Sequence, residues 1–400
     1  MDRPSRSEFG THWALDPGTT FLNHGSFGAC PTAVLEEQSR LRALLESDPV
    51  DFYLHRGPAL WQESIRTLSD FVGADPAGMT FQTNASGGVN TVLRSLALRP
   101  GDEIIVSDHA YRACRNAVDY ACARSGASVV QVAIPFRPEG DEQVAELFLK
   151  AATGRSRLAL IDTVTSPTAL RMPFERLTRA LQDRGIDVLV DAAHGPGLIP
   201  LDLDALGAAY VTGNCHKWLC TPKGSAFLHI RADRRHLIEP LTISHGYSAD
   251  VGAAEKFRME FDWQGTQDPT PWLCIPRAIE HLGGMLPGGW PAVMARNHAL
   301  ALQAREALCD VLGADSLAPA SMTTAMVAAQ LPADPMARLE SAFQVDPLRQ
   351  ALYDRYRIQA VVSPWQPHRT RYLRVSAALY NAAGEYRYLA EALRSLTTGS

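Results

Sequence analysis

Cysteine is scarce in this sequence, and its placement excludes two kinds of structure. The seven cysteines among 400 residues are an odd number, lie far apart and include no CxxC pair. Disulfide frameworks and structural zinc sites need sets of suitably spaced cysteines, so the sequence predicts neither, and we expect no metal site. Most of these thiols are expected to be buried, in a protein of a reducing compartment.

Long apolar runs and long runs of like charge are also missing. No segment reaches the roughly 18 uncharged apolar residues of a membrane-spanning helix, and the first residues lack the apolar stretch of a secretory signal. The 38 basic and 43 acidic side chains are dispersed and leave a net charge of −5. Nucleic acids and membranes are therefore not expected as partners, and the sequence predicts a cytoplasmic protein.

Between about residues 30 and 230, amphipathic helical stretches alternate with short β-branched runs. This pattern predicts an α/β fold with a mostly parallel seven-stranded sheet, and the apolar strands suggest that both of its faces are covered. The expected strands are Met79–Thr83, Glu103–Ser107, Ser128–Ile134, Leu158–Val164, Asp187–Ala193, Ala209–Gly213 and Ser225–Ile230. The expected helices are Thr32–Glu46, Pro58–Val72, Gly87–Leu98, Arg112–Arg124, Glu142–Ala152 and Phe174–Arg184.

A proline-rich run, Thr266–Pro276, interrupts this alternation and predicts a change of domain. We expect a large domain over residues 20–270 and a smaller α+β domain over residues 271–400, with residues 1–19 packing on the smaller one. Within it, helical patterns run from Arg277 to Leu312, and Tyr372–Asn381 is expected as a strand before a closing helix.

The strongest chemical signal is a pair of residues at neighbouring strand ends. Asp191 ends an apolar strand, and Lys217 follows the next strand along the chain. In such sheets, ligands bind beyond the carboxyl ends of the strands. An aldehyde cofactor needs a lysine for its Schiff base and an acid to keep its pyridine nitrogen protonated. The alternatives are structural: a helix-capping aspartate and a solvated lysine.

A turn of small residues, Thr83–Gly88, joins a strand to a helix. Its backbone N–H groups lie at the positive end of the helix dipole, where a phosphate binds favourably, and Ser86 adds a hydroxyl donor. Glycines at such turns also serve geometry alone. The turn has neither the GK[ST] ending of a P-loop nor the GxGxxG spacing of dinucleotide folds, which argues against a nicotinamide-dependent dehydrogenase.

Eight motifs in order resemble one known group of enzymes. They are FLNHGSFG, QTNASGGVNTVLRSL, SDHAYRACRNAV, DTVTSPTALRMP, VDAAHGPG, GNCHKWLCTPKGSAFL, DWQGTQDP and LRVSAALYN, from about Phe21 to Asn381. Together they resemble fold type I enzymes of the class V aminotransferase superfamily, and more closely the isopenicillin N epimerase-like branch. The resemblance implies a pyridoxal 5'-phosphate (PLP) cofactor and a homodimer with active sites at the subunit interface.

The resemblance also implies roles for single residues around the cofactor. Lys217 would hold the cofactor and move the α-proton, Asp191 would pair with the pyridine nitrogen, and His194 would contact the phenolic oxygen, together with Thr165 or Ser166. His109 would stack on the ring, with Tyr111 as the competitor for that position. The phosphate would be held by Ser86, Gly87, Asn214, His216 and, from a second subunit, Thr266. Ser86 departs from the threonine that relatives often have, but it keeps the hydroxyl.

A substrate site follows from the same resemblance. Arg374 would bind the α-carboxylate, because a guanidinium forms bidentate hydrogen bonds with a carboxylate. Asn23, His24 and Tyr111 are the further candidates for substrate contact. A surface arginine on a strand is the structural alternative for Arg374.

The reaction remains open among several outcomes that share Lys217. Epimerase or aminotransferase chemistry on an amino acid is the first hypothesis, and a carbon–sulfur lyase similar to hercynylcysteine sulfoxide lyase is the second. Epimerisation needs an acid on the far side of the α-carbon, for which Tyr111, His24, Tyr53 and His55 are candidates. A persulfide-forming desulfurase is disfavoured because no cysteine lies between Leu317 and Tyr372. A non-catalytic protein of this fold would typically have lost Lys217 or Asp191.

Overall fold

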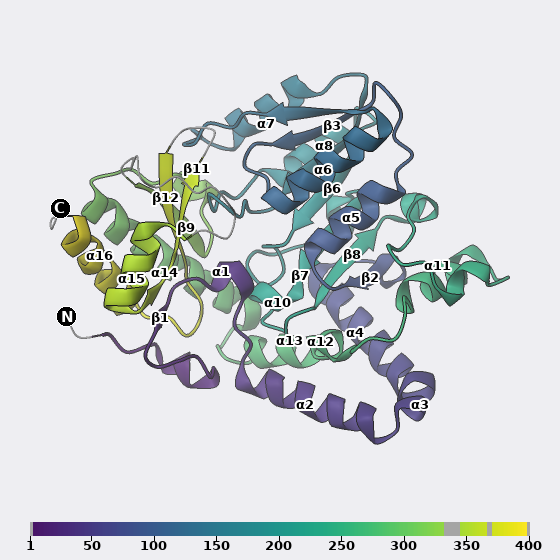
Figure 1. Ribbon diagram of the computed structural model, residues 1–400, viewed down its shortest axis with the longest axis horizontal. Helices are drawn as coiled ribbons and strands as arrows, with labels where there is room; N and C mark the ends of the chain where they lie inside the picture. Colours follow the sequence, from purple (N-terminus) through teal and green to yellow (C-terminus); the bar gives the residue numbers. More distant parts are fainter. Residues whose placement is uncertain (1–2, 332–344, 366–369, 398–400) are drawn as a thin grey trace.

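The computed structural model describes residues 3–331, 345–365 and 370–397. Its centre is a seven-stranded sheet in the order β2-β8-β7-β6-β5-β3-β4 (Figure 1). β3 to β7 run parallel to one another, and β8 is antiparallel to both β7 and β2. The strands are β2 (Met79–Gln82), β3 (Glu103–Ser107), β4 (Ser128–Val132), β5 (Ser156–Asp162), β6 (Asp187–Ala192), β7 (Tyr210–Asn214) and β8 (Ala226–Ile230).

The apolar strands bury both faces of this sheet. Leu158 and Leu160 of β5 pack with α5 (Ala85–Ser95) and α6 (Arg112–Ser125), whereas Ala159 and Ile161 pack in the cluster on the opposite face. That opposite face is covered by α4 (Gly57–Val72), α7 (Asp141–Ala151) and α8 (Phe174–Gln182). The alternation follows from the two-residue period of a strand, and it means that every second residue faces α5 and α6.

A smaller three-stranded antiparallel sheet stands beside the large one (Figure 1). Its order is β11 (Val361–Trp365), β12 (Thr370–Ser376) and β9 (Met326–Leu331). α14 (Gly289–Leu312), α15 (Pro347–Tyr356) and α16 (Ala383–Thr397) form an apolar core with this sheet. The short strand β1 (Thr20–Phe21) pairs with β10 (Ile358–Gln359), so the start of the chain joins the same body.

The predicted α/β class and the mostly parallel seven-stranded sheet are confirmed, and each strand end of that sheet lies within two residues of its expected place. The strand expected over Tyr372–Asn381 is β12, which begins at Thr370 and already ends at Ser376. The pattern overlooked β9, β11, α15 and α11 (Ala253–Asp262). At the expected change of domain, α13 (Ile275–Gly283) packs on α2 (Thr32–Ser47) and α4, while α14 packs on α16 and β9. Among the described residues, no helix has both the length and the apolar character needed to cross a membrane.

Candidate active site

The two residues of the strongest sequence signal meet at one edge of the sheet. Asp191 is the last residue but one of β6, and Lys217 lies in α10 (Cys215–Trp218), the single helical turn directly after β7. β6 and β7 are parallel neighbours, with Asp191 in register with Thr212, so both residues reach the carboxyl edge. Each lies close enough to the other to change its pKa.

Two donors hold the carboxylate of Asp191. The backbone N–H of Ala193 donates to Oδ1 at 2.9 Å, and the thiol of Cys114 in α6 donates to Oδ2 at 3.2 Å. Burial raises the pKa of Asp191 above its usual range, and these two hydrogen bonds and Lys217 act against that rise. The carboxylate of Asp191 is therefore a buried hydrogen-bond acceptor that is held in a fixed orientation.

The amine of Lys217 meets His194 with its Nζ 3.1 Å from Nε2. The indole N–H of Trp218 donates to Nδ1 of the same histidine at 3.2 Å, so Nε2 of the neutral imidazole carries the proton and points at the amine. This arrangement suits a neutral lysine that accepts a hydrogen bond. Burial and the nearby Arg374 lower the pKa of Lys217 to about 8, while Asp191 acts in the opposite direction.

The motif that contains His24 supports the turn that carries Lys217. His24 is buried; its Nε2 lies 3.0 Å from the carbonyl oxygen of Lys217, and its Nδ1 lies 2.9 Å from the hydroxyl of Tyr380. Gly28 approaches so closely that a Cβ there would lie 2.2 Å from the carbonyl oxygen of His216. We assigned His24 to the substrate from sequence, but both of its ring nitrogens are engaged behind the lysine.

Three candidates for phosphate binding, Ser86, Gly87 and Asn214, meet at the first turn of α5. The side chain of Asn84 caps this helix by accepting from the Gly87 N–H at 2.9 Å, and Asn214 Oδ1 accepts from the Ala85 N–H at 2.8 Å. Ser86 stands between Ala85 and Gly87 in this turn. Gly88 has no room for a side chain, because a Cβ would lie 2.1 Å from Thr212 Oγ1. His216 contacts the Ser225 carbonyl oxygen through Nδ1, and burial lowers its pKa to about 4.

Arg374 is a buried cation without a counter-charge. Its guanidinium donates to the carbonyl oxygen of Ser166 and, at 2.9 Å, to the hydroxyl of Ser26, with Asn23 Oδ1 at 3.5 Å. Its exposed fraction is 4%, and Nε is buried without a hydrogen-bond partner. No carboxylate in the described parts of the chain forms an ion pair with it. Since a buried charge is costly without a partner, this arginine marks a site for an anion.

The two candidates for stacking on the cofactor ring have different surroundings. His109 is fully buried; its Nδ1 lies 2.7 Å from Thr168 Oγ1, its Nε2 lies 3.3 Å from the Ile134 carbonyl oxygen, and its ring packs against Trp365. Tyr111 is 46% exposed, and Asp191 and Arg374 both influence the pKa of its hydroxyl. Because Tyr111 is the more exposed of the two, it is easier for a ligand to reach than His109. Stacking of either residue on the cofactor ring stays a prediction.

Thr165 and Ser166 also differ in their surroundings. Thr165 Oγ1 is bonded to Thr168 Oγ1 at 2.8 Å and to the Leu170 N–H at 2.9 Å, and the residue is fully buried. Ser166 is partly exposed and is a partner of Arg374. Ser166 therefore has the hydroxyl that is easier for a ligand to reach.

Sequence reasoning missed two residues of this site. Cys114 was treated only as a buried thiol, and Asp162, the last residue of β5, was not noticed at all. Asp162 ends the run LALID just as Asp191 ends DVLVD, so the signal that identified one aspartate was present for the other.

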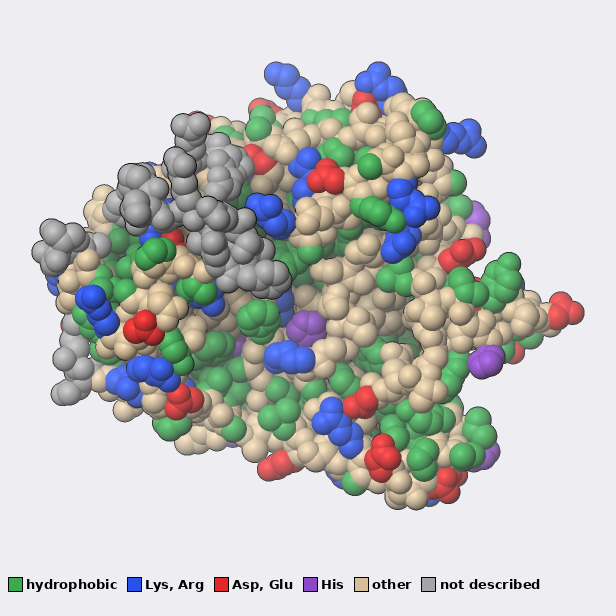
Figure 2. Space-filling model, in the orientation of Figure 1, with side chains coloured by type: hydrophobic (Ala, Val, Ile, Leu, Met, Phe, Trp, Pro, Cys, Tyr) green, Lys and Arg blue, Asp and Glu red, His purple; other side chains and the backbone are tan. Residues whose placement is uncertain are grey.

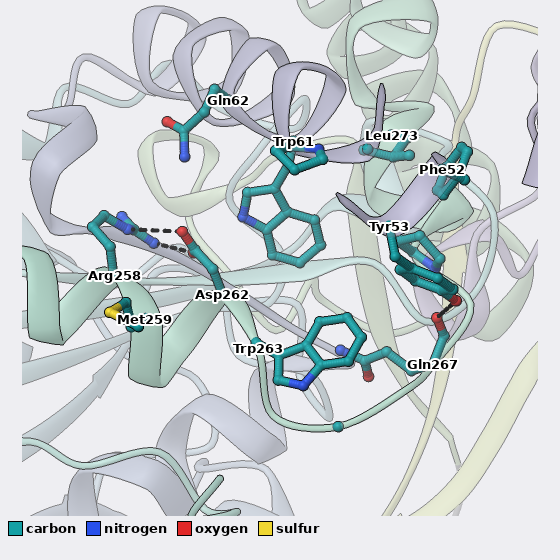
Figure 3. Close-up of a pocket in the computed structure, with 14 residues that line it drawn as sticks. Phe52, Tyr53, Trp61, Gln62, Arg258, Met259, Asp262, Trp263, Gln267 and Leu273 are labelled. Carbon is teal, nitrogen blue, oxygen red and sulfur yellow. Dashed lines mark hydrogen bonds and ion pairs between the residues drawn. The ribbon is translucent and has the colours of Figure 1, made fainter. Parts of the chain in front are cut away.

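Thr266 is exposed, and its loop neighbours Gly265 and Gln267 line an apolar cavity of about 290 Å³. The rings of Tyr53, Trp61 and Trp263 surround this cavity (Figure 3). The hydroxyl of Tyr53 donates to the Gln267 carbonyl oxygen at 2.7 Å, which fixes the loop. Contact between Thr266 and the cofactor of a second subunit stays a prediction.

Three comparisons place this geometry among known proteins. The family model "Aminotransferase class-V" matches residues 59–333. The isopenicillin N epimerase of Streptomyces clavuligerus is 33% identical over 96% of both chains, and a putative L-cysteine desulfhydrase of Oryza sativa is 30% identical over 98% of this chain and 85% of its own. The cystine C–S lyase C-DES, solved with its product cysteine persulfide, superposes with a TM-score of 0.80 at 20% identity, over 94% of this chain and 98% of the other.

Proposed function

This chain belongs to the aminotransferase class V family, whose cofactor is pyridoxal 5'-phosphate, and on that basis we propose that it acts on a bond at the α-carbon of an amino acid or amino-acid-containing substrate. Epimerase or aminotransferase chemistry similar to that of isopenicillin N epimerase is our first candidate. A carbon–sulfur lyase is the second, because relatives of comparable identity carry desulfhydrase names.

The residues present fit the cofactor. PLP, when bound, supplies an aldehyde for a Schiff base and a pyridinium ring that takes up electrons from the α-carbon. Lys217 offers an amine with a lowered pKa, and Asp191 offers a buried carboxylate held by two donors. The N-terminus of α5 with Ser86 offers a phosphate site. These groups supply the amine, the counter-charge for the pyridinium and the anion site that PLP requires.

One observation carries the proposal: Arg374 is buried near Lys217 with no acidic partner in the described chain. An α-carboxylate bound there would neutralise the guanidinium and orient the α-carbon toward the lysine amine. Ser26 and Ser166, which already contact the guanidinium, hold it in place for that purpose.

The same residues suggest how protons move. Lys217 lies on one side of the proposed substrate, where its neutral amine would take the α-proton as a base and the resulting ammonium would return it as an acid. Of the four candidates for a second acid, His24 is engaged behind the lysine, and Tyr53 donates to Gln267 beside the apolar cavity. Tyr111 is the candidate whose hydroxyl lies within electrostatic reach of Asp191 and Arg374, so we assign it the opposite-face role.

A persulfide-forming desulfurase is not our choice. That chemistry needs a nucleophilic cysteine near the carboxylate-binding arginine, and the sequence contains none between Leu317 and Tyr372. Burial raises the pKa of the Cys220 thiol, and burial together with the charge of Asp191 raises that of Cys114, which suits packing and hydrogen bonding rather than nucleophilic attack.

A panel of L- and D-amino acids separates the candidates. The purified enzyme is incubated in D₂O with each, and α-hydrogen exchange, 2-oxo acid formation and release of pyruvate with ammonia are followed together. Inversion of configuration identifies an epimerase, the 2-oxo acid of the substrate with its amino group transferred to an added 2-oxo acid acceptor identifies an aminotransferase, and pyruvate with free ammonia identifies a lyase. Tyr111→Phe should slow inversion while exchange continues. A protein that takes up no PLP and gives none of the three signals would refute the proposal.

The rate of cofactor uptake should report the pKa of Lys217. Only the neutral amine attacks an aldehyde, and this pKa lies at about 8. The uptake rate of cofactor-free protein is therefore expected to rise about tenfold from pH 6 to pH 7 and to level off above about pH 8. Stopped-flow absorbance measures it. A rate that keeps rising up to pH 10 would show an ordinary lysine instead.

We further propose a homodimer in which Thr266 reaches the cofactor of the other subunit. The edge of the molecule formed by α11 and by α3 (Pro49–Asp51) shows hydrophobic side chains at its surface (Figure 2). Val50, Leu54, Ile243, Tyr247 and Met259 are all exposed there. Surfaces of this kind usually meet a partner. Sedimentation of the enzyme as a monomer at assay concentration would exclude this arrangement.

A further inference from the structure

Asp162 places a second carboxyl group beside Asp191. It is the last residue of β5, and the parallel pairing of β5 with β6 sets Asp162 directly opposite Asp191. Neighbouring strands lie about 4.8 Å apart, and paired residues project from the same face of the sheet. Leu160 of β5 and Leu189 of β6, two residues before each aspartate, both pack in the cluster under α5 and α6. Both carboxyl groups therefore project toward Cys114.

The pair is buried, and Lys217 is the one cation among the described residues that acts on both carboxyl groups. Asp162 is 4% exposed and Asp191 3% exposed, and neither forms an ion pair with a described residue. The titratable groups that face Asp162 are Asp191 from β6, Cys114 from α6 and Lys217 from α10. Two adjacent buried carboxylates repel each other strongly, so one of the two is expected to keep its proton.

Hydrogen bonding decides which carboxyl is charged. Asp191 accepts from the Ala193 N–H and from the Cys114 thiol, and both bonds favour its ionised form. Within the described chain, the only hydrogen bond to the carboxyl of Asp162 comes from its own backbone N–H. Burial and the charge of Asp191 raise the pKa of Asp162 well above its usual range, and its own backbone N–H and Lys217 lower it only in part.

We propose that Asp162 is a protonated carboxylic acid that lies beside the carboxylate of Asp191 and leaves a single negative charge for the pyridine nitrogen of the cofactor. Asp162 is then a positioning residue, because its O–H donates to the carboxylate of Asp191 and keeps that side chain oriented. This inference rests on the proposed PLP site for its purpose, although the protonation itself is a property of the protein without cofactor.

Infrared spectroscopy of cofactor-free protein tests the protonation directly. A protonated carboxyl has a carbonyl stretch separate from that of a carboxylate, and the difference spectrum of wild type minus Asp162→Asn at pH 7 should contain this band. Asp183→Asn, at an exposed position, is the control and should remove no such band. A band that survives Asp162→Asn, or that only Asp191→Asn removes, overturns the proposal. If Asp162→Asn does not fold, Asp162→Ser replaces it.

A second measurement uses enzyme loaded with ¹⁵N-labelled PLP. Replacing a neutral acid by a neutral amide leaves the charge near the pyridine nitrogen unchanged, so its proton affinity in Asp162→Asn should stay within tenfold of the wild type. Removal of a real negative charge from this pair would reduce that affinity by about a hundredfold. A reduction of tenfold or more therefore overturns the proposal. If PLP does not bind, the proposed function fails, but the infrared result still decides the state of Asp162.

Discussion

Lys217→Ala is expected to remove the visible absorption of the bound cofactor and to lower kcat/KM by about 10⁴-fold or more. Two contributions are lost together, since the same amine holds the cofactor covalently and moves the proton at the α-carbon. The environment of Lys217 supports both, because Nε2 of His194 lies 3.1 Å from the amine and the pKa of the lysine is lowered to about 8. Difference absorbance and steady-state kinetics provide the two measurements.

The chain offers simple controls for this experiment. It contains only four lysines, Lys150, Lys217, Lys223 and Lys256, so borohydride reduction followed by peptide mapping can identify the modified residue. Lys150→Ala, on the exposed face of α7, should leave absorption and rate unchanged. Retention of a reducible cofactor bond in Lys217→Ala would move the covalent site to another lysine and contradict our assignment.

Arg374→Met is expected to separate function from stability. The loss of a guanidinium that binds the α-carboxylate should cost about 2–5 kcal/mol of transition-state binding, or roughly 30- to 4,000-fold in kcat/KM. The melting temperature, in contrast, should stay the same or rise. The cofactor-free enzyme buries this cation without an acidic partner among the described residues, and an apolar side chain of similar length removes that cost.

Arg374→Lys is the matched variant. It keeps the positive charge but loses the fork that reaches both oxygens of a carboxylate, so its kcat/KM should lie between those of the wild type and Arg374→Met. Cofactor absorption should persist in both variants. A clear fall in melting temperature for Arg374→Met, with unchanged kinetics, would show that the arginine serves the fold through Ser166 and Ser26 rather than the substrate.

Residues of the large sheet were predictable because their signal is local. β5 and β6 are apolar runs that end in aspartate, and the parallel arrangement that places both ends at one edge follows from the alternation with helices. β9 was missed because its partner β12 lies far along the chain, whereas β11 is next to β12 in sequence but contains Pro364, and neither strand has a clear period of two. Pairing of that kind depends on tertiary contacts rather than on the local pattern.

The site shows the same division. Lys217 and Asp191 follow from their places at strand ends, whereas the role of His24 depends on where Tyr380 and the Lys217 carbonyl lie, more than 150 residues away. A buried polar residue can form hydrogen bonds with a ligand or with another part of the chain, and the sequence alone does not distinguish the two. Cys114 is a similar case, because its bond to Asp191 spans 77 residues.

The short segment around α1 (His24–Phe27) touches both ends of the proposed substrate site. His24 braces the carbonyl of Lys217, and Ser26 accepts a hydrogen bond from the guanidinium of Arg374. The same stretch follows β1, which is paired with β10 of the small body. A rotation of the small body would therefore move α1 and, through it, the turn that carries Lys217. We expect an insertion in α1 to change the distance between the amine of Lys217 and the guanidinium of Arg374.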